Sequence, residues 1–150
     1  MPIEIERKFL IKNDNWKSQV EKSVSIKQGY LSTDLERTTR IRILDEKAYL
    51  TVKGKSKGAT RSEFEYEIPY NDALELLDLC KSKIIEKVRH YIVKEKHTWE
   101  LDVFEGVHEG LVLAEIELNA EDEHFELPDW VGEEVTGDVK YYNSWLAKEH

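Results

Sequence analysis

Three charged residues near the N-terminus have the types and spacing of a metal-binding group. Glu4, Glu6 and Lys8 alternate with Ile5 and Arg7. Alternate side chains of a β-strand share one face, so a strand here places two carboxylates and an amine side by side. Carboxylate oxygens are the ligands that hard divalent cations prefer. The segment therefore predicts a strand that can bind such a cation next to a positive group.

Six later segments repeat this alternation, each with a pair of polar residues two positions apart. The pairs are Arg40 and Arg42, Thr51 and Lys53, Glu63 and Glu65, Lys87 and Arg89, Glu100 and Asp102, and Glu115 and Glu117. One interpretation is an ordinary sheet with one solvated face. Two features count against it for the whole set. The charges are sorted by sign within each strand, although like charges about 7 Å apart repel. The Arg40 and Arg42 pair also offers planar forks that suit phosphate or carboxylate.

The elements that must position these residues are mostly strands. Alternating apolar residues and turn signals predict strands at 3–11, 25–32, 39–44, 48–53, 63–69, 85–94, 98–104 and 112–118. An apolar stripe at helical spacing predicts a helix from about 71 to 82. Shorter helices are expected around Trp16, at 121–125 and at 138–148, with a break at Pro128 and Gly132.

This pattern predicts a mainly β (α+β) fold. We expect a closed eight-stranded antiparallel β-barrel with a few flanking helices, because closure removes the exposed edges of the sheet. No break in composition divides the chain, so residues 1–150 are expected to form one domain. If the charged faces point inward, the barrel becomes a polar tunnel in which carboxylates hold Mg²⁺ or Mn²⁺ and cationic strands hold phosphate oxygens.

Composition narrows the class of partner. The chain has 31 acidic and 22 basic residues and a formal net charge of −9, so binding to nucleic acid is not expected. Cys80 is the only cysteine, which excludes an internal disulfide and agrees with a reducing cytoplasm. Apolar runs are too short for a signal core or a membrane span of roughly 20 residues. We expect a cytoplasmic protein that acts on a small anion.

The ordered set of charged motifs resembles the CYTH superfamily, also called triphosphate tunnel metalloenzymes. The resemblance begins with Glu4-x-Glu6-x-Lys8 and runs over nearly the full chain. It continues through Tyr30, Arg40-x-Arg42, Lys53, Arg61-x-Glu63-x-Glu65, Lys87-x-Arg89, Asp102, Glu115-x-Glu117, the Trp130 segment and Tyr142-Asn143. It implies an eight-stranded barrel tunnel that acts on triphosphate substrates with Mg²⁺ or Mn²⁺.

The resemblance also implies roles for individual residues. Metal ligands are expected at Glu4, Glu6, Glu115 and Glu117, and phosphate ligands at Arg40, Arg42, Lys53 and Arg89. Arg61, Glu63, Glu65 and Asp102 are expected to support them. Glu63 and Glu65 either ligate metal or position basic side chains through ion pairs, and positioning is the preferred interpretation.

Three residues are candidates for direct catalysis. A lysine that is crowded by cations and partly desolvated has a lowered pKa, so it can accept a proton from an attacking water. The resemblance implies that Lys8, with Tyr30 and Lys87 nearby, activates or orients that water. The alternative is that Lys8 and Lys87 only bind phosphate, and the sequence does not separate the two roles.

The sequence therefore predicts a metal-dependent triphosphatase. Inorganic tripolyphosphate is the preferred substrate, because little of the chain is left to recognise a base or a thiazolium. Hydrolysis of thiamine or nucleoside triphosphates and an adenylate cyclase of class IV type are enzymatic alternatives. A non-catalytic binder of polyphosphate or nucleotides is the alternative from another class. Either a monomer or a homodimer is compatible with the sequence.

Overall fold

The computed structural model describes residues 3–80 and 83–147, and most of them form strands. Eight of the strands follow one another along the chain. They are β1 (Ile3–Ile11), β2 (Lys22–Ser32), β3 (Arg37–Leu44), β4 (Lys47–Gly54), β5 (Thr60–Ile68), β6 (Ile85–Lys94), β7 (His97–Phe104) and β8 (Val112–Glu117). The predicted strands are all present, with bounds that differ by up to three residues.

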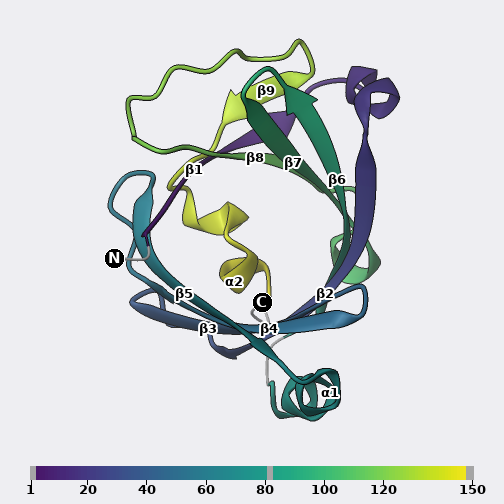
Figure 1. Cartoon of the computed structure of the whole chain (residues 1–150), viewed down its shortest axis with the longest axis vertical. Helices are drawn as coiled ribbons and strands as arrows, with labels where there is room; N and C mark the ends of the chain where they lie inside the picture. The colour runs from purple at the N-terminus through teal and green to yellow at the C-terminus, as the bar shows by residue number, and fades with distance from the viewer. Residues whose placement is uncertain (1–2, 81–82, 148–150) are drawn as a thin grey trace.

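These eight strands close into an antiparallel barrel. The order around the ring is β1, β5, β4, β3, β2, β6, β7, β8 and back to β1 (Figure 1). β1 completes the ring because it has partners on both sides. Its first residues, Ile3–Ile5, pair with Thr60–Ser62 of β5, and Glu6–Leu10 pair with β8. The predicted closed eight-stranded barrel is thus confirmed.

Charged side chains point into this barrel, and the main apolar core lies on its outer surface. The largest cluster includes Phe9 of β1, Trp99 of β7 and Ile116 of β8, all at most 3 % exposed. The 3₁₀-helix η1 (Asn15–Gln19) adds Trp16 to this cluster, and the segment that follows β8 adds Trp130. The strands alternate because each one separates this apolar layer from a polar interior.

Two smaller apolar clusters cover other parts of the barrel. The helix α1 (Tyr70–Leu79) packs Ala73 and Leu77 on the outer faces of β3 and β4. At one end of the barrel, Leu146 and Ala147 of the C-terminal segment pack with Phe104 and other residues of the wall. That segment contains the 3₁₀-helix η3 (Val139–Tyr141) and the helix α2 (Asn143–Leu146). Figure 1 looks through the ring of strands and shows α2 inside it.

The C-terminal third differs from the sequence-based expectation in three places. A ninth strand, β9 (Val131–Glu134), pairs with β1 outside the ring, where Gly132 was expected to break the chain. Gly132 suits this strand because an added Cβ would lie 3.1 Å from the carbonyl oxygen of Leu10. The helix expected at 121–125 is wrong, since the segment forms turns and extended chain.

The last predicted helix, 138–148, is also wrong in its extent. The chain forms η3 and α2 with extended backbone at Tyr142 between them, so two short helical pieces replace one helix. Residue 148 lies outside the described residues, as do residues 81–82 at the predicted end of α1. A short 3₁₀-helix, η2 (Gly106–His108), occupies the turn before β8.

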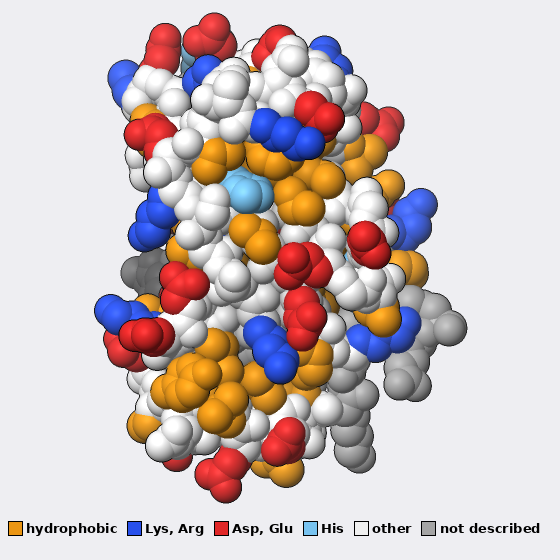
Figure 2. Space-filling model, turned by 90° about the vertical axis from the view of Figure 1, so that its right-hand side faces the viewer, with side chains coloured by type: hydrophobic (Ala, Val, Ile, Leu, Met, Phe, Trp, Pro, Cys, Tyr) orange, Lys and Arg blue, Asp and Glu red, His pale blue; other side chains and the backbone are white. Residues whose placement is uncertain are grey.

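On one outer face of the molecule, charge is not sorted by sign as it is in the interior. Figure 2 shows Lys and Arg side chains interspersed with Asp and Glu on one face of the molecule.

None of the helices within the described ranges has the length and apolar character needed to span a membrane.

Candidate active site

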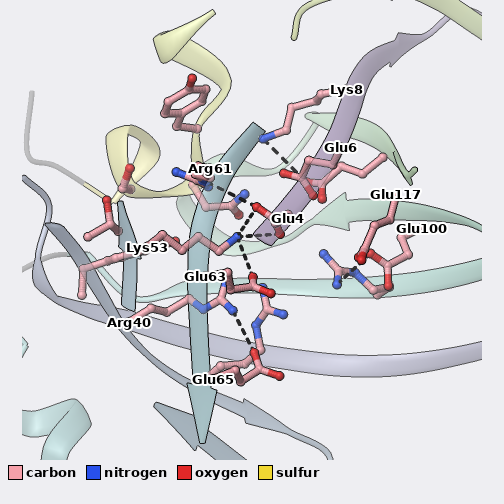
Figure 3. Close-up of a pocket in the computed structure, with 18 residues that line it drawn as sticks. Glu4, Glu6, Lys8, Arg40, Lys53, Arg61, Glu63, Glu65, Glu100 and Glu117 are labelled. Atoms are coloured by element: carbon pink, nitrogen blue, oxygen red, sulfur yellow. Dashed lines mark hydrogen bonds and ion pairs between the residues drawn. The ribbon is translucent and has the colours of Figure 1, made fainter. Parts of the chain in front are cut away.

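A cavity inside the barrel collects side chains from all eight strands of the ring. Thirteen of the fifteen predicted site residues line it. They are Glu4, Glu6, Lys8, Tyr30, Arg40, Arg42, Lys53, Arg61, Glu63, Glu65, Arg89, Glu115 and Glu117. Figure 3 shows them converging on one space. Residues that are far apart in the chain meet because each strand points every second side chain inward.

The predicted metal-binding carboxylates lie together on β1 and β8. Glu6 faces Glu117 across the two strands, and Lys8 faces Glu115 in the same register. Burial first, and then the negative charges of Glu115 and Glu4, together raise the pKa of Glu6 to about 8. Burial also raises the pKa of Glu117, with smaller contributions from Glu4 and Glu100. Both shifts have the same two causes, which are burial first and repulsion between neighbouring carboxylates second.

Two carboxylates of this group are already paired with bases. Burial alone would raise the pKa of Glu4, but Lys53 and Arg61 lower it to about 2. Burial likewise opposes ionisation of Glu115, and Lys8 and Arg89 hold its pKa well below the usual range. The amine of Lys8 lies 3.6 Å from Glu115. Neighbouring positive charge therefore stabilises the ionised forms of Glu4 and Glu115, as expected for buried carboxylates.

The donor set fits a hard divalent cation in its chemistry. Four carboxylates lie on the adjacent strands β1 and β8, and the charges of Glu115 and Glu4 add to burial in raising the pKa of Glu6. As the side chains stand, no three His, Cys, Asp or Glu residues within the described ranges are grouped closely enough to hold an ion. The ion pairs of Glu4 with Lys53 and of Glu115 with Lys8 explain this arrangement.

A second group in the same cavity consists of buried arginines. Burial first, and then the positive charges of Arg40 and Arg89, together lower the pKa of Arg42 to about 10. Arg42 Nε donates to the neutral amide oxygen of Gln28 at 2.8 Å. Arg40 Nε is buried and has no hydrogen-bond partner among the described residues. Unsatisfied buried donors are costly, so this group favours an anionic ligand.

Three of the predicted supporting residues contact charged or polar side chains of the cavity. Lys53 lies 3.3 Å from Glu63, and Arg61 Nε lies 3.3 Å from Glu4. Glu65 accepts a hydrogen bond from Thr51 at 3.0 Å and lies 3.5 Å from Arg40. Both Glu63 and Glu65 thus contact basic side chains or their neighbours, which agrees with the preferred positioning interpretation.

Lys87 and Asp102 are the two predicted residues that do not line the cavity. The amine of Lys87 is fully buried and lies 2.7 Å from Asp102, which also accepts two hydrogen bonds from Arg89 at 2.8 and 2.9 Å. Burial lowers the pKa of Lys87 to about 7, with Asp102 acting in the opposite direction. The catalytic role expected for Lys87 stays a prediction.

Lys8 and Tyr30 do line the cavity. Lys8 donates to the backbone carbonyl of Tyr141 at 2.9 Å, and its amine lies 5.7 Å from the centre of the Tyr142 ring. The buried Tyr30 hydroxyl accepts a hydrogen bond from Gln28 at 3.1 Å. Both side chains therefore reach the space between the carboxylates and the arginines.

Several residues of the cavity wall carried no predicted role. Thr38, Glu100, Tyr142, Asn143 and Ser144 line the cavity. Glu100 was recognised only as part of an inward face, and Tyr142 and Asn143 only as part of the resemblance. The sequence predicted only a helix at 138–148 for this segment, which gave no signal that its polar residues reach the interior.

The fold and the site together define a class of protein: a closed antiparallel barrel whose interior opposes carboxylates to arginines. Residues 2–142 match the CYTH domain, and the chain belongs to this family. An inorganic triphosphatase of Acetivibrio thermocellus is 50 % identical over 146 residues, which cover 97 % of this chain and 93 % of that protein.

Two further comparisons agree. An inorganic triphosphatase of Nitrosomonas europaea is 34 % identical over 148 residues, with 96 % of each chain covered. A crystal structure of an inorganic triphosphatase superposes with a TM-score of 0.68 at 33 % identity, and covers 100 % of this chain and 97 % of that one.

Proposed function

We propose that this chain hydrolyses inorganic tripolyphosphate to pyrophosphate and phosphate with the help of Mg²⁺ or Mn²⁺. The observation that carries the proposal is the pair Arg40 and Arg42. Arg40 has an unpartnered buried donor, Arg42 has a neutral partner, and both face a crowded group of carboxylates. An anion with bound divalent cations satisfies both groups at once. The names of the two curated relatives support the choice of substrate.

The cavity residues bind and orient the substrate in this proposal. Arg40, Arg42, Arg89 and Lys53 donate to phosphate oxygens and stabilise the charge that develops in the transition state. Glu4, Glu6, Glu115 and Glu117 would hold the divalent cation, which supplies charge neutralisation to the phosphate chain when it is bound. Glu63, Glu65 and Arg61 keep the basic and acidic side chains in place.

Hydrolysis then requires one water molecule. Its oxygen bonds to a terminal phosphorus, the bridging P–O bond breaks, and pyrophosphate and phosphate are the products. Lys8 is the best-placed base or orienting group, because it lines the cavity between Glu115 and the C-terminal segment. Tyr30 lines the same cavity, and its hydroxyl can orient the water.

A cytoplasmic location and a monomeric or dimeric state also stay predictions.

The test is a substrate screen with purified protein. Phosphate and pyrophosphate release is measured for tripolyphosphate, ATP and thiamine triphosphate with Mg²⁺ or Mn²⁺, and cyclic AMP is measured with ATP. We expect tripolyphosphate to be turned over fastest and EDTA to stop the reaction. Absence of turnover would leave the non-catalytic binder as the explanation. Cyclic AMP would favour the cyclase, and preference for another triphosphate would reassign the substrate.

A further inference from the structure

The C-terminal segment makes a direct contact with the buried Lys87. The Nζ of Lys87 donates to Oδ1 of Asn143 at 3.0 Å and lies 2.7 Å from a carboxylate oxygen of Asp102. Lys87 is fully buried, whereas Asn143 is partly exposed and lines the cavity. Asn143 therefore stands between a buried lysine and the space that would hold the substrate. It is also the first residue beyond the part of the chain that matches the CYTH domain.

The contact with Lys87 decides which way the Asn143 amide faces. Lys87 Nζ donates in this contact, and in its protonated form it can only donate, so the group that faces it is the amide oxygen. The amide nitrogen, with two N–H groups, then points away from Lys87. Asn143 also lines the cavity, so an amide N–H directed there would suit an anion.

The residues that follow Asn143 in α2 are held by packing and by hydrogen bonds, and these contacts fix the position of Asn143. Leu146 and Ala147 are buried in the apolar cluster at this end of the barrel. His108 Nε2 hydrogen bonds to the carbonyl of Leu146 at 2.8 Å, and the backbone N–H of Lys83 donates to the carbonyl of Ala147 at 2.7 Å. A short helix held at its carbonyl end keeps the side chain at its start in one place, which is the requirement for a preorganised ligand contact.

We propose that Asn143 donates a hydrogen bond from its side-chain amide to a phosphate oxygen of the substrate, and that Lys87 is a positioning residue that orients this amide. The proposal rests on the proposed function for the identity of the substrate. It gives Lys87 a role that agrees with its place outside the cavity lining. It also makes the C-terminal segment a part of the binding site.

Three variants separate this role from a structural one. Asn143→Ala removes the donor, and we expect kcat/KM for tripolyphosphate to fall roughly 10- to 100-fold, as for a hydrogen bond to a charged group. Asn143→Asp keeps an acceptor for Lys87 but turns a carboxylate toward the anion, so its kcat/KM should fall at least as far. Lys87→Met frees the amide to rotate and should also lower kcat/KM.

The double variant tests whether Lys87 acts through Asn143. If it does, Lys87→Met combined with Asn143→Ala loses no more kcat/KM than Asn143→Ala alone. Losses that multiply would overturn the positioning role. An Asn143→Asp protein with unchanged kcat/KM would overturn the donor role. Asn71→Ala is the matched control, since Asn71 is exposed on α1 outside the barrel and should keep full activity.

A direct measurement on the unaltered protein makes the test independent of variants that fold poorly. The chain has five asparagines and two glutamines, so the side-chain amide signals in a ¹⁵N NMR spectrum are few. Inorganic tripolyphosphate added in EDTA, which prevents turnover, should shift the Asn143 amide signal. A protein that hydrolyses tripolyphosphate but shows an unmoved Asn143 signal contradicts this proposal alone. A protein with no turnover contradicts the proposed function.

Discussion

Lys53 and Glu4 form an ion pair inside the barrel. Lys53 Nζ donates to both carboxylate oxygens of Glu4, at 3.1 and 3.0 Å, and both side chains are at most 10 % exposed. One of these residues is the predicted phosphate ligand from β4, and the other is a predicted metal ligand from β1. The two functions therefore compete in the protein alone, and a metal-bound triphosphate would have to separate this pair (Figure 3).

The first prediction follows from this competition. Lys53→Met leaves Glu4 with Arg61 as its partner, so the substrate-free protein should bind Mg²⁺ more tightly, because the cation no longer displaces Lys53. The same change should lower kcat/KM for tripolyphosphate roughly 10- to 100-fold, since a charged contact to phosphate is lost. Calorimetric titration and steady-state kinetics measure the two effects.

The opposite directions of these effects make the prediction specific. Lys47→Met is the control, because Lys47 is exposed at the start of the same strand. Weaker Mg²⁺ binding by Lys53→Met would show that Lys53 does not compete for Glu4.

The second prediction concerns Glu6 and the crowding that raises its pKa. Glu6→Gln removes one carboxylate from a group of like charges, so the thermal midpoint should stay the same or rise. Turnover with Mg²⁺ or Mn²⁺ should fall by at least the roughly 100-fold that loss of a supporting group can cost at a metal site. Thermal unfolding and phosphate release are the measurements, and Glu46→Gln in an exposed turn is the control. Full activity of Glu6→Gln would show that Glu6 is not a metal ligand.

The third prediction is a pH dependence of stability caused by Lys87. Its pKa is about 7 in the folded protein against an ordinary value of 10.5. Between these pH values the unfolded chain binds a proton that the folded chain has released, so stability rises with pH. Relative to Lys87→Met, the free energy of unfolding should increase by up to about 1.4 kcal/mol for each pH unit within this window.

Denaturant unfolding of both proteins across the window measures this difference. Asp102 keeps its two hydrogen bonds to Arg89 when Lys87 is replaced, so the comparison isolates the lysine. A difference in stability that does not change with pH would mean that Lys87 keeps its proton throughout.

The fourth prediction concerns the anchor of the C-terminal segment. His108→Leu removes the hydrogen bond to the carbonyl of Leu146 and should cost about 1 kcal/mol of stability. It should also lower kcat/KM for tripolyphosphate, because Asn143 loses its fixed position at the cavity wall. Hydrogen exchange of α2 should become faster than in the unaltered protein. Unchanged exchange and kinetics would show that apolar packing of Leu146 and Ala147 suffices to hold the segment.

Much of the barrel was predictable from residues 3–118, because the strands obey a local rule. Glu4, Glu6 and Lys8 alternate with Ile5 and Arg7, and the same period of two recurs in the later strands. Since the period of a strand is two, the inward face could be read without knowledge of strand order. Thirteen of the predicted site residues consequently line one cavity.

The C-terminal region was poorly predicted for a different reason. Val131–Glu134 forms a strand through its pairing with β1, and Gly132 contributes by letting the backbones approach. Asn143 faces the interior because Leu146 and Ala147 are buried at the end of a barrel built from earlier strands. These segments are short and carry weak periodicity, so long-range contacts decide their structure.

The sequence by itself determined which side chains share a face, and therefore that carboxylates and arginines would gather inside a barrel. This follows because successive side chains of a β-strand point to opposite faces. The tertiary structure alone decided which of these charges neutralise each other. Lys53 with Glu4 and Lys87 with Asn143 are contacts between distant segments, and Lys87 with Asp102 is a contact between paired strands. Their distances depend on the closure of the ring and on the packing of the C-terminal segment into its end.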